Sequence, residues 1–211
     1  MNIGIIGSGH IGGNFGLHLA KAGHQVMFSS RHPEQLADLV RQAGSNAQAG
    51  TIAQAADSGS LVVLSIPYGK IPEVAEQVGT FVHGKTLIDT CNAYPQRDGE
   101  IAERVRQNPD LRETQLTVDS FPMASVVKAL NTIYFVNLRD YAFRPEGSRY
   151  ALPIAGNRET AKKEVTDLLH EIGFDVLDVG SIADSKVMEV DQLFYNKPMS
   201  LQEMQKAAGS R

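Results

Sequence analysis

Residues 3–12 read IGIIGSGHIG, a short apolar run that passes directly into a glycine-rich turn. The glycines form the pattern G-x-G-x-x-G, and apolar residues at helical spacing follow it. In such a turn the first glycine allows a tight bend, the second lets a pyrophosphate approach the backbone, and the third lets helix and strand pack closely. The alternative is a glycine-rich turn that merely connects two elements. The strand and helix around it favour a dinucleotide site, which comprises Gly7, Ser8, Gly9, His10, Ile11 and Gly12.

Apolar runs and helical periodicity alternate along the rest of the chain. Continuous short runs are typical of strands in a parallel sheet that is buried on both faces, and the apolar stripes between them are typical of the covering helices. We therefore expect the α/β class, with a Rossmann-type doubly wound, mostly parallel sheet and helices on both faces. The expected strands are residues 3–6, 25–29, 46–50, 61–66, 86–89, 126–130, 151–155 and 174–179, and the expected helices include 11–22, 36–43, 71–82, 100–107 and 161–172.

No linker, repeat or charge block marks a domain boundary in the sequence. We expect residues 1–180 to form one nucleotide-binding domain and residues 181–211 to form a helical extension, which belongs to the same domain or to an oligomer contact. Residues 139–150 read as an irregular loop, and the small and polar residues 206–211 are expected to fray. A further helix face is expected from Val187, Val190 and Phe194, and it would either close the domain's own core or support a homodimer.

Composition narrows the classes of partner. The 211 residues carry 20 basic and 24 acidic side chains, a formal net charge of −4, with no Lys/Arg block, so we expect no nucleic-acid partner. No apolar run approaches the ~20 residues that span a bilayer, and the N-terminus lacks the basic stretch of a signal peptide, so we expect no membrane association. No Cys/His cluster has zinc-ligand spacing, so no metal is expected. Cys91, the single cysteine, is expected to be a buried filler in a cytoplasmic protein.

The end of the second expected strand distinguishes NAD from NADP. In this fold a carboxylate there binds the ribose 2′-hydroxyl of NAD, whereas a cation accommodates the 2′-phosphate of NADP. The chain reads Ser30-Arg31-His32 and has no acid before Glu34. Arg31 offers paired N–H donors, and Ser30 and His32 offer further contacts. The alternative is that Ser30 or His32 caps the next helix and Arg31 is solvated, but both can hold together. We expect NADP.

Two more strand ends are expected at the same edge of the sheet, where open α/β sheets bind ligands. One reads Ser65-Ile66-Pro67-Tyr68, and Pro67 ends that strand because it has no N–H to donate. Tyr68 either covers a ring of the cofactor or packs in the core. At the end of the next strand, Asn92 is expected to contact the nicotinamide ribose or amide.

The chain resembles the NADP-dependent oxidoreductases typified by the archaeal and bacterial reductase of the deazaflavin coenzyme F420. It is also similar to the cytosolic domains of the six-transmembrane epithelial ferric reductases. The resemblance covers the chain to about residue 180. It rests on the glycine turn, Ser29-Ser30-Arg31, Ser65-Ile66-Pro67 and above all VVKALNTI at 126–133, which looks like the family's V-K-A-F-N-T-I with Leu130 in place of Phe. The resemblance implies that Ser30 and Arg31 hold the 2′-phosphate and that Lys128 and Asn131 belong to the pocket of the second substrate.

Lys128 also draws attention without the resemblance. It lies among apolar residues on a strand that is expected to be buried, and a buried ammonium needs a partner or a ligand. The alternative is a lysine at a strand end that extends to water. The chain departs from the family at Thr90–Pro95, where members commonly have Asn-Pro, and residues 134–149 and those after 181 match nothing in the family.

The reaction that the resemblance implies is hydride transfer between the nicotinamide of NADPH and a deazaflavin (F420-like) or flavin-like acceptor. Such a transfer needs mainly positioning, so no acid–base residue is assigned. One alternative is an NADPH-dependent reductase of a small imine, carbonyl or quinone substrate. Another is a redox sensor that binds NADP without turnover. Fold alone does not separate these classes.

Overall fold

The computed structural model describes residues 1–209 and contains an eight-stranded sheet. The strand order is β3-β2-β1-β4-β5-β6-β7-β8, and every neighbouring pair is parallel except β6 and β7, which are antiparallel. This confirms the expected doubly wound, mostly parallel α/β sheet. The strands are β1 (Asn2–Ile6), β2 (Gln25–Ser29), β3 (Ala47–Gly50), β4 (Leu61–Leu64), β5 (Thr86–Asp89), β6 (Ser125–Lys128), β7 (Ala151–Gly156) and β8 (Asp175–Asp178).

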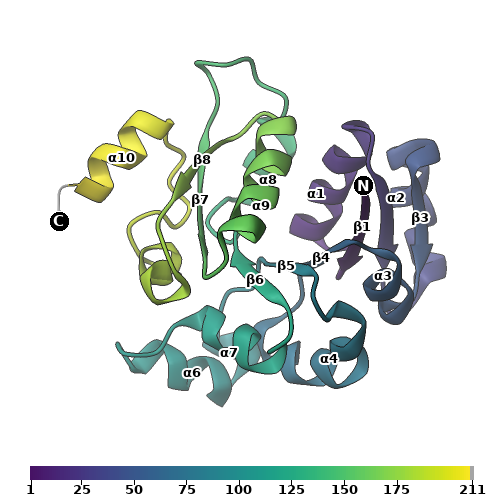
Figure 1. Cartoon of the computed structure of the whole chain (residues 1–211), viewed down its shortest axis with the longest axis horizontal. Coiled ribbons are helices and arrows are strands. Elements are labelled where there is room, and N and C mark those ends of the chain that lie inside the picture. The colour runs from purple at the N-terminus through teal and green to yellow at the C-terminus, as the bar shows by residue number, and fades with distance from the viewer. Residues whose placement is uncertain (210–211) are drawn as a thin grey trace.

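Helices cover both faces of this sheet. Figure 1 shows α1, α8 and α9 on one side and α4, α6 and α7 on the other. The helices are α1 (His10–Lys21), α2 (Ala37–Ala43), α3 (Ile52–Ser58), α4 (Ile71–Val78), α5 (Pro95–Asp98), α6 (Glu100–Gln107), α7 (Glu113–Ser120), α8 (Phe135–Asp140), α9 (Glu159–Glu171) and α10 (Leu201–Gly209). The 3-10 turns are η1 (Pro33–Leu36), η2 (Gly44–Asn46), η3 (Tyr68–Lys70), η4 (Gly79–Val82) and η5 (Ile182–Met188).

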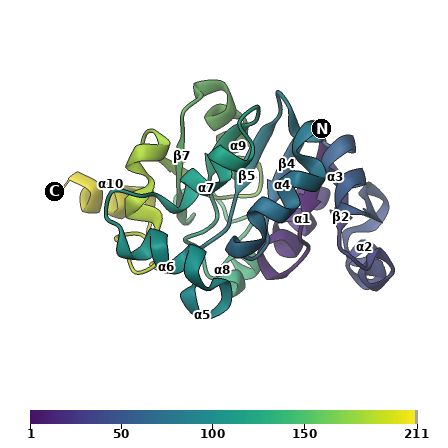
Figure 2. The same ribbon diagram turned by 90° about the horizontal axis from the view of Figure 1, so that it is seen from below.

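Two apolar cores lie on the two faces of the sheet. One includes Phe15 and Leu19 of α1 and Val165 and Leu169 of α9, and the other includes side chains of α4, α6 and α7. The helical stripes read from the sequence therefore face the sheet, as amphipathic helices do when their apolar side is buried. In Figure 1 and Figure 2 the helices α2 and α10 lie at opposite ends of the molecule, as the strand order requires.

The C-terminal part differs from the expectation. Residues 187–194 do not form the expected helix: η5 ends at Met188, and Asp191 and Asn196 adopt positive φ angles of 64° and 52° that interrupt any helix. The helix of this region is α10, which contains 201–209, so the expected fraying is wrong for 206–209, and residues 210 and 211 lie outside the described part. A small cluster that includes Phe194 and Met204 packs this segment against β7 and β8.

Two strands also end at an earlier residue than the sequence predicted. β4 ends at Leu64 and not at residue 66, and β6 ends at Lys128 because Leu130 has a φ of 62°, which no strand accommodates. The irregular segment begins after α8, whose last residue is Asp140.

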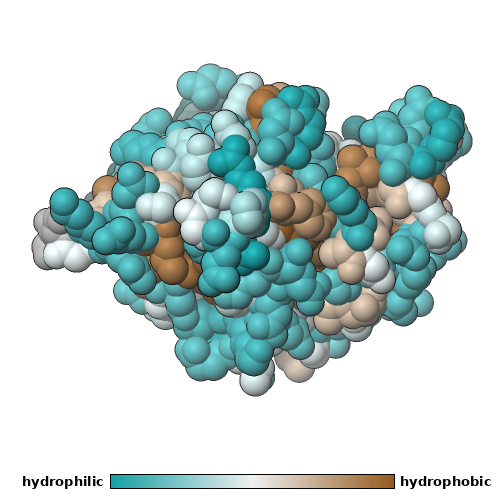
Figure 3. Space-filling model, turned by 90° about the horizontal axis from the view of Figure 1, so that it is seen from above, coloured by the Kyte–Doolittle hydropathy of each residue, from teal (hydrophilic) through white to brown (hydrophobic). Residues whose placement is uncertain are grey.

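The surface of the molecule is mostly hydrophilic on the face shown in Figure 3. Apolar groups form small, separate patches between hydrophilic side chains on the face that Figure 3 shows. Within residues 1–209, no helix has the length and apolar character that crossing a membrane requires, and no cluster of three His, Cys, Asp or Glu residues could hold a metal ion.

Candidate functional site

The glycine turn joins β1 to α1 in the geometry that the G-x-G-x-x-G pattern predicts. Gly7 has a φ of 93°, and a Cβ there would lie 2.2 Å from the carbonyl oxygen of Ser65. A Cβ at Gly12 would lie 2.1 Å from the carbonyl oxygen of Gly7. At Gly9, by contrast, a Cβ would meet nothing within 4 Å, so the space in front of this residue is open. Two glycines thus serve the packing of the turn, and the third keeps its backbone accessible.

The first turn of α1 offers backbone donors to that open space. Gly9 is the N-cap of α1, and no side chain caps the helix. The N–H groups at a helix start carry a partial positive charge and bind anions when no side chain satisfies them. Ser8 holds the turn against β2, since its Oγ donates to the carbonyl oxygen of Ser29 at 3.1 Å. The turn therefore has the features of a phosphate cradle.

A cleft of about 430 Å³, called the Arg31 cleft below, opens beside this turn at the carboxyl ends of β1, β2 and β4. Ser30 and Arg31 lie in its wall, but His32 does not: its imidazole is exposed and its Nδ1 lies 3.3 Å from Glu34 Oε1. The Oγ of Ser30 accepts a hydrogen bond from the N–H of His32 at 3.1 Å. No side chain caps η1, which begins after His32, so the alternative in which Ser30 or His32 caps the next helix is wrong. The predicted residues that line the cleft are Gly7, Ser8, Gly9, Ser30, Arg31, Ile66 and Pro67.

Sequence reasoning missed the far wall of the Arg31 cleft. Lys70, Glu73 and Gln77 line it from η3 and α4, and Lys70 Nζ lies 2.8 Å from Glu73 Oε2. The hydrogen bond from Lys70 and the charges of Lys70 and Arg31 lower the pKa of Glu73. The cleft therefore contains two cations and one carboxylate. The position of Lys70 in the turn after β4 was the available signal, because such turns reach the ligand side of an open sheet.

A second cavity of about 280 Å³, called the His10 cavity, lies at the ends of β5 and β6 on the other side of the glycine turn. The predicted residues His10, Ile11, Asn92 and Asn131 line it. The His10 ring stacks on Phe135 with the ring centroids 4.3 Å apart. Because the turn lies between the Arg31 cleft and the His10 cavity, one extended ligand that crosses the turn can reach both.

Two hydrogen bonds connect Asn92 and Asn131. Asn92 Nδ2 donates to the carbonyl oxygen of Asn131 at 2.8 Å, and Asn131 Nδ2 donates to Asn92 Oδ1 at 3.1 Å and to the carbonyl oxygen of Met188 at 2.7 Å. These bonds tie the ends of β5 and β6 to the C-terminal segment. The two asparagines therefore fix the floor of the His10 cavity.

Lys128 is not in the wall of the His10 cavity, so its predicted place in a substrate pocket is not what the structure shows. Its side chain is 1% exposed, which also excludes the alternative of a lysine that extends to water. Its Nζ lies 3.2 Å from Asp89 Oδ2 and donates to the carbonyl oxygen of Cys91. Burial lowers the pKa of Lys128, but the charges of Asp89 and Glu113 outweigh burial and the net shift is upward. Lys128 is a buried cation whose partner is a buried aspartate beneath the cavity floor.

Tyr68 and Cys91 are core residues. Tyr68 is 3% exposed and packs with α4 in the second core, so the packing alternative holds and the ring covers no cofactor site. Cys91 is 2% exposed, and burial raises the pKa of its thiol, as expected of a filler and not of a nucleophile. Ser65 contributes its backbone to the packing of Gly7 and is not in the wall of the Arg31 cleft.

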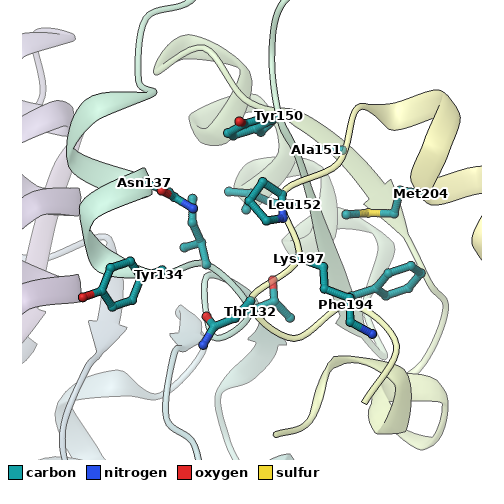
Figure 4. Close-up of a pocket in the computed structure, with 12 residues that line it drawn as sticks. Thr132, Tyr134, Asn137, Tyr150, Ala151, Leu152, Phe194, Lys197 and Met204 are labelled. Carbon is teal, nitrogen blue, oxygen red and sulfur yellow. The ribbon is translucent and has the colours of Figure 1, made fainter. Parts of the chain in front are cut away.

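Four aromatic residues also line the His10 cavity, and they were not predicted. Tyr94 follows β5, Tyr134 and Phe135 begin α8, and Tyr195 comes from the segment before α10. The cavity continues into a narrow slot with which it shares Ile133, Tyr134 and Asn196. Figure 4 shows this slot, with Tyr134 and Asn137 on one side and Phe194 and Met204 on the other. Tyr94 and Tyr195 lie outside the strands and helices, and α8 is a short helix of six residues, so the sequence offers no long periodic pattern in these segments.

Comparison with known proteins relates this chain to one group of oxidoreductases. Residues 2–93 match the family model described as NADP oxidoreductase coenzyme F420-dependent. The rat metalloreductase STEAP3 is 28% identical over 190 residues, which are 89% of this chain and 35% of that protein. This chain therefore spans about a third of the length of its curated relative.

Two solved structures are similar to this chain. A candidate F420-dependent NADP reductase from Arthrobacter sp. FB24 superposes with a TM-score of 0.72 and 27% identity, covering 88% of this chain and 87% of that one. A hypothetical protein from Sinorhizobium meliloti has a TM-score of 0.81 and 24% identity over 95% of both chains, which supports the fold. Residues 2–93, with the glycine turn and Arg31 among them, are thus similar to the coenzyme F420-dependent NADP oxidoreductases.

Proposed function

We propose that the protein transfers a hydride between NADP(H) and a deazaflavin-like or flavin-like acceptor that binds in the His10 cavity. The observation that carries the proposal is the arrangement of two cavities on either side of an open glycine turn, with a guanidinium in one and aromatic rings in the other. An NADP molecule has its phosphate-bearing adenosine and its nicotinamide at opposite ends of a pyrophosphate. The cavities match that sequence of groups.

The Arg31 cleft fits the adenosine half. Arg31 and the Ser30 hydroxyl would hold the 2′-phosphate, since a guanidinium can donate paired hydrogen bonds to a phosphate. The amides of the glycine turn and of the first turn of α1 would bind the pyrophosphate. Lys70 adds a second cation on the opposite wall of the cleft.

The His10 cavity fits the nicotinamide half and the acceptor. NADPH supplies the hydride when it is bound, so the residues of this chain have to position two rings and exclude water. Asn92 is held by Asn131 at the end of β5 and offers polar atoms to the nicotinamide ribose or amide. Aromatic side chains suit a planar acceptor because rings stack on one another.

Oxidation of NADPH with a panel of acceptors tests the proposal. Reduced nicotinamide absorbance would be followed after addition of coenzyme F420, FMN or a quinone. The proposal predicts steady oxidation with F420 or FMN that depends on the protein. Tight NADPH binding without oxidation by any acceptor would contradict it and would favour a sensor.

Arg31→Ala is expected to weaken NADPH binding by about 1–3 kcal/mol, because a charge-assisted contact to the 2′-phosphate is lost. NADH lacks that phosphate, so its binding should hardly change. Calorimetric titration with both cofactors measures this. Arg41→Ala serves as the matched control, because Arg41 is an exposed arginine that pairs with Asp38 on α2 outside the Arg31 cleft. Equal losses for NADPH and NADH would refute the role of Arg31.

Gly9→Ala is expected to weaken NADPH binding by about tenfold or more, a loss of at least 1.4 kcal/mol. The added methyl group would project into the open space through which a pyrophosphate reaches the backbone. The fold should be unaffected because the methyl group meets no protein atom within 4 Å. Gly79→Ala is the control, since its Cβ is equally free of contacts but lies outside the cleft. Unchanged NADPH affinity in folded Gly9→Ala would place the pyrophosphate elsewhere.

A further inference from the structure

The hydroxyl groups of Tyr94 and Tyr195 form a pair in the wall of the His10 cavity. Their oxygens are 2.5 Å apart, and the two residues are 101 positions apart in the sequence. Tyr94 is the residue directly before α5, in the segment that follows β5, and Tyr195 belongs to the segment between η5 and α10. The pair therefore connects the C-terminal segment to the ligand edge of the sheet.

Both tyrosines are held in place by their surroundings. The guanidinium of Arg97 lies 4.9 Å from the centroid of the Tyr94 ring, and the backbone N–H of Tyr94 donates to Asp98 Oδ2 at 3.0 Å. Next to Tyr195, the backbone N–H of Asn196 donates to the carbonyl oxygen of Thr132 at 2.8 Å. The hydroxyl pair is thus positioned before any ligand arrives, which is the condition for electrostatic stabilisation without reorganisation.

A count of protons shows what the pair can do. Two tyrosine hydroxyls carry two protons, and the bond between the two oxygens uses one of them. The second proton remains available to an acceptor atom in the cavity. Burial and the bond from Tyr94 raise the pKa of Tyr195, so that hydroxyl stays protonated at neutral pH. The pair is consequently a fixed hydrogen-bond donor formed by two residues that line the His10 cavity.

We propose that the Tyr94–Tyr195 hydroxyl pair is the binding site for an oxygen of the electron acceptor, one that is conjugated to the atom receiving the hydride. This inference rests on the proposed function and narrows its substrate class to conjugated ring carbonyls, imides and quinones. Transfer breaks one C–H bond of the dihydronicotinamide with its electron pair and forms one bond from that hydride to the acceptor ring. The electron pair displaced within the acceptor moves onto the conjugated oxygen, where the pair donates to it. Water then protonates the reduced acceptor, and both tyrosines keep their protons.

Phenylalanine substitutions test the pair without removing its rings. Each single variant leaves one hydroxyl, whose proton is then free for the acceptor. The rate constant for hydride transfer should therefore fall only slightly in Tyr94→Phe and in Tyr195→Phe. The double variant has no donor left, and its rate constant for hydride transfer to FMN and to menadione should fall by about tenfold or more. NADPH affinity should change little, because the contacts to the 2′-phosphate and the pyrophosphate lie in the Arg31 cleft and the glycine turn, and the hydroxyl pair is assigned to the acceptor and not to the nicotinamide.

Tyr141→Phe is the matched control. Tyr141 and Tyr150 form another tyrosine pair, with ring centroids 4.6 Å apart, and Tyr141 lies outside the His10 cavity. Removing the hydroxyl group of Tyr141 should leave the rate constant for hydride transfer unchanged.

A second readout does not depend on turnover. The dissociation constant of FMN from the complex with NADP⁺, followed by flavin fluorescence, should rise much less in the double variant than the rate constant falls, because the hydrogen bond to the acceptor oxygen becomes stronger as charge develops on it. A structural role in shaping the cavity would weaken FMN binding along with the rate.

Two outcomes overturn the inference and can be told apart. If the wild type oxidises NADPH and the double variant does so at the same rate, the pair is not the oxygen site but the proposed function stands. If the wild type binds NADPH but reduces neither FMN, menadione nor F420, the proposed function fails and the inference falls with it.

Discussion

Lys128→Met is expected to lower the free energy of unfolding by about 3–5 kcal/mol, the usual cost of leaving one member of a buried ion pair without its partner. The side chains of Lys128 and Asp89 are each 1% exposed, and their charged atoms are 3.2 Å apart. Methionine has a similar length but no charge, so the carboxylate of Asp89 would remain in the core without a counterion. Urea denaturation followed by circular dichroism measures the effect.

A surface lysine gives the matched control for this experiment. Lys163 on α9 pairs with Asp167 at 2.7 Å, but its side chain is 74% exposed. Exposed pairs contribute about 0–1 kcal/mol, so Lys163→Met should be nearly neutral. If Lys128→Met were as mild as Lys163→Met, the ion pair with Asp89 would not be part of the folded state.

Adding Asp89→Asn to Lys128→Met should restore part of the lost stability. The amide oxygen of asparagine can still accept the hydrogen bond that the N–H of Cys91 gives to Asp89 Oδ1 at 2.8 Å. The buried negative charge, however, disappears. The two substitutions should therefore be less than additive, as is expected for residues in direct contact. Strict additivity of the two losses would speak against a direct interaction.

Glu113→Gln is expected to make the stability of the folded state less sensitive to a rise in pH from about 4.5 to about 7. Glu113 is fully buried, its Oε2 accepts from the N–H of Ala93 at 3.1 Å, and its Oε1 has no hydrogen-bond partner among residues 1–209. Burial, opposed by the charge of Lys128, raises the pKa of this carboxyl from 4.5 to about 7. Glu189 adds a second carboxylate close by, since its Oε1 accepts from the N–H of Glu113 at 2.8 Å.

The sign of the pH dependence follows from this raised pKa. Below pH 4.5 the carboxyl is neutral in both states, and between pH 4.5 and about 7 the unfolded chain loses the proton first. The folded state therefore becomes progressively less stable as pH rises through this window. The stability advantage of Glu113→Gln over the wild type should grow by about 2–3 kcal/mol between pH 5 and pH 8. A constant difference across that range would contradict the raised pKa of Glu113.

The sequence predicts strands and helices correctly where their apolar residues form a regular pattern. The run before Gly7 and the runs at 25–29 and 86–89 are strands with the predicted bounds or within one residue of them, because strands buried on both faces are continuously apolar. The glycine turn was predictable because its three glycines each have a separate steric reason. Arg31 lines the cleft beside the turn as its position after β2 predicts.

The aromatic wall of the His10 cavity could not be predicted from the sequence, and the reason is physical. Tyr94 and Tyr195 lie in irregular segments far apart in the chain, and only the packing of the C-terminal segment brings their hydroxyls together. Lys128 was correctly singled out as a buried cation, but the sequence did not show that Asp89 on the neighbouring strand already neutralises it. Whether Lys128 has a protein partner or binds a ligand depends on which residue lies opposite it on β5, and the sequence does not show this register.

Calorimetric titration of the unmodified protein with NADPH and with NADH tests the central claim, which is that the Arg31 cleft holds the phosphorylated adenosine of NADP. The account predicts one site that binds NADPH at least about tenfold more tightly than NADH, a difference of 1.4 kcal/mol or more. Equal affinity for the two cofactors, or binding of neither, would contradict it.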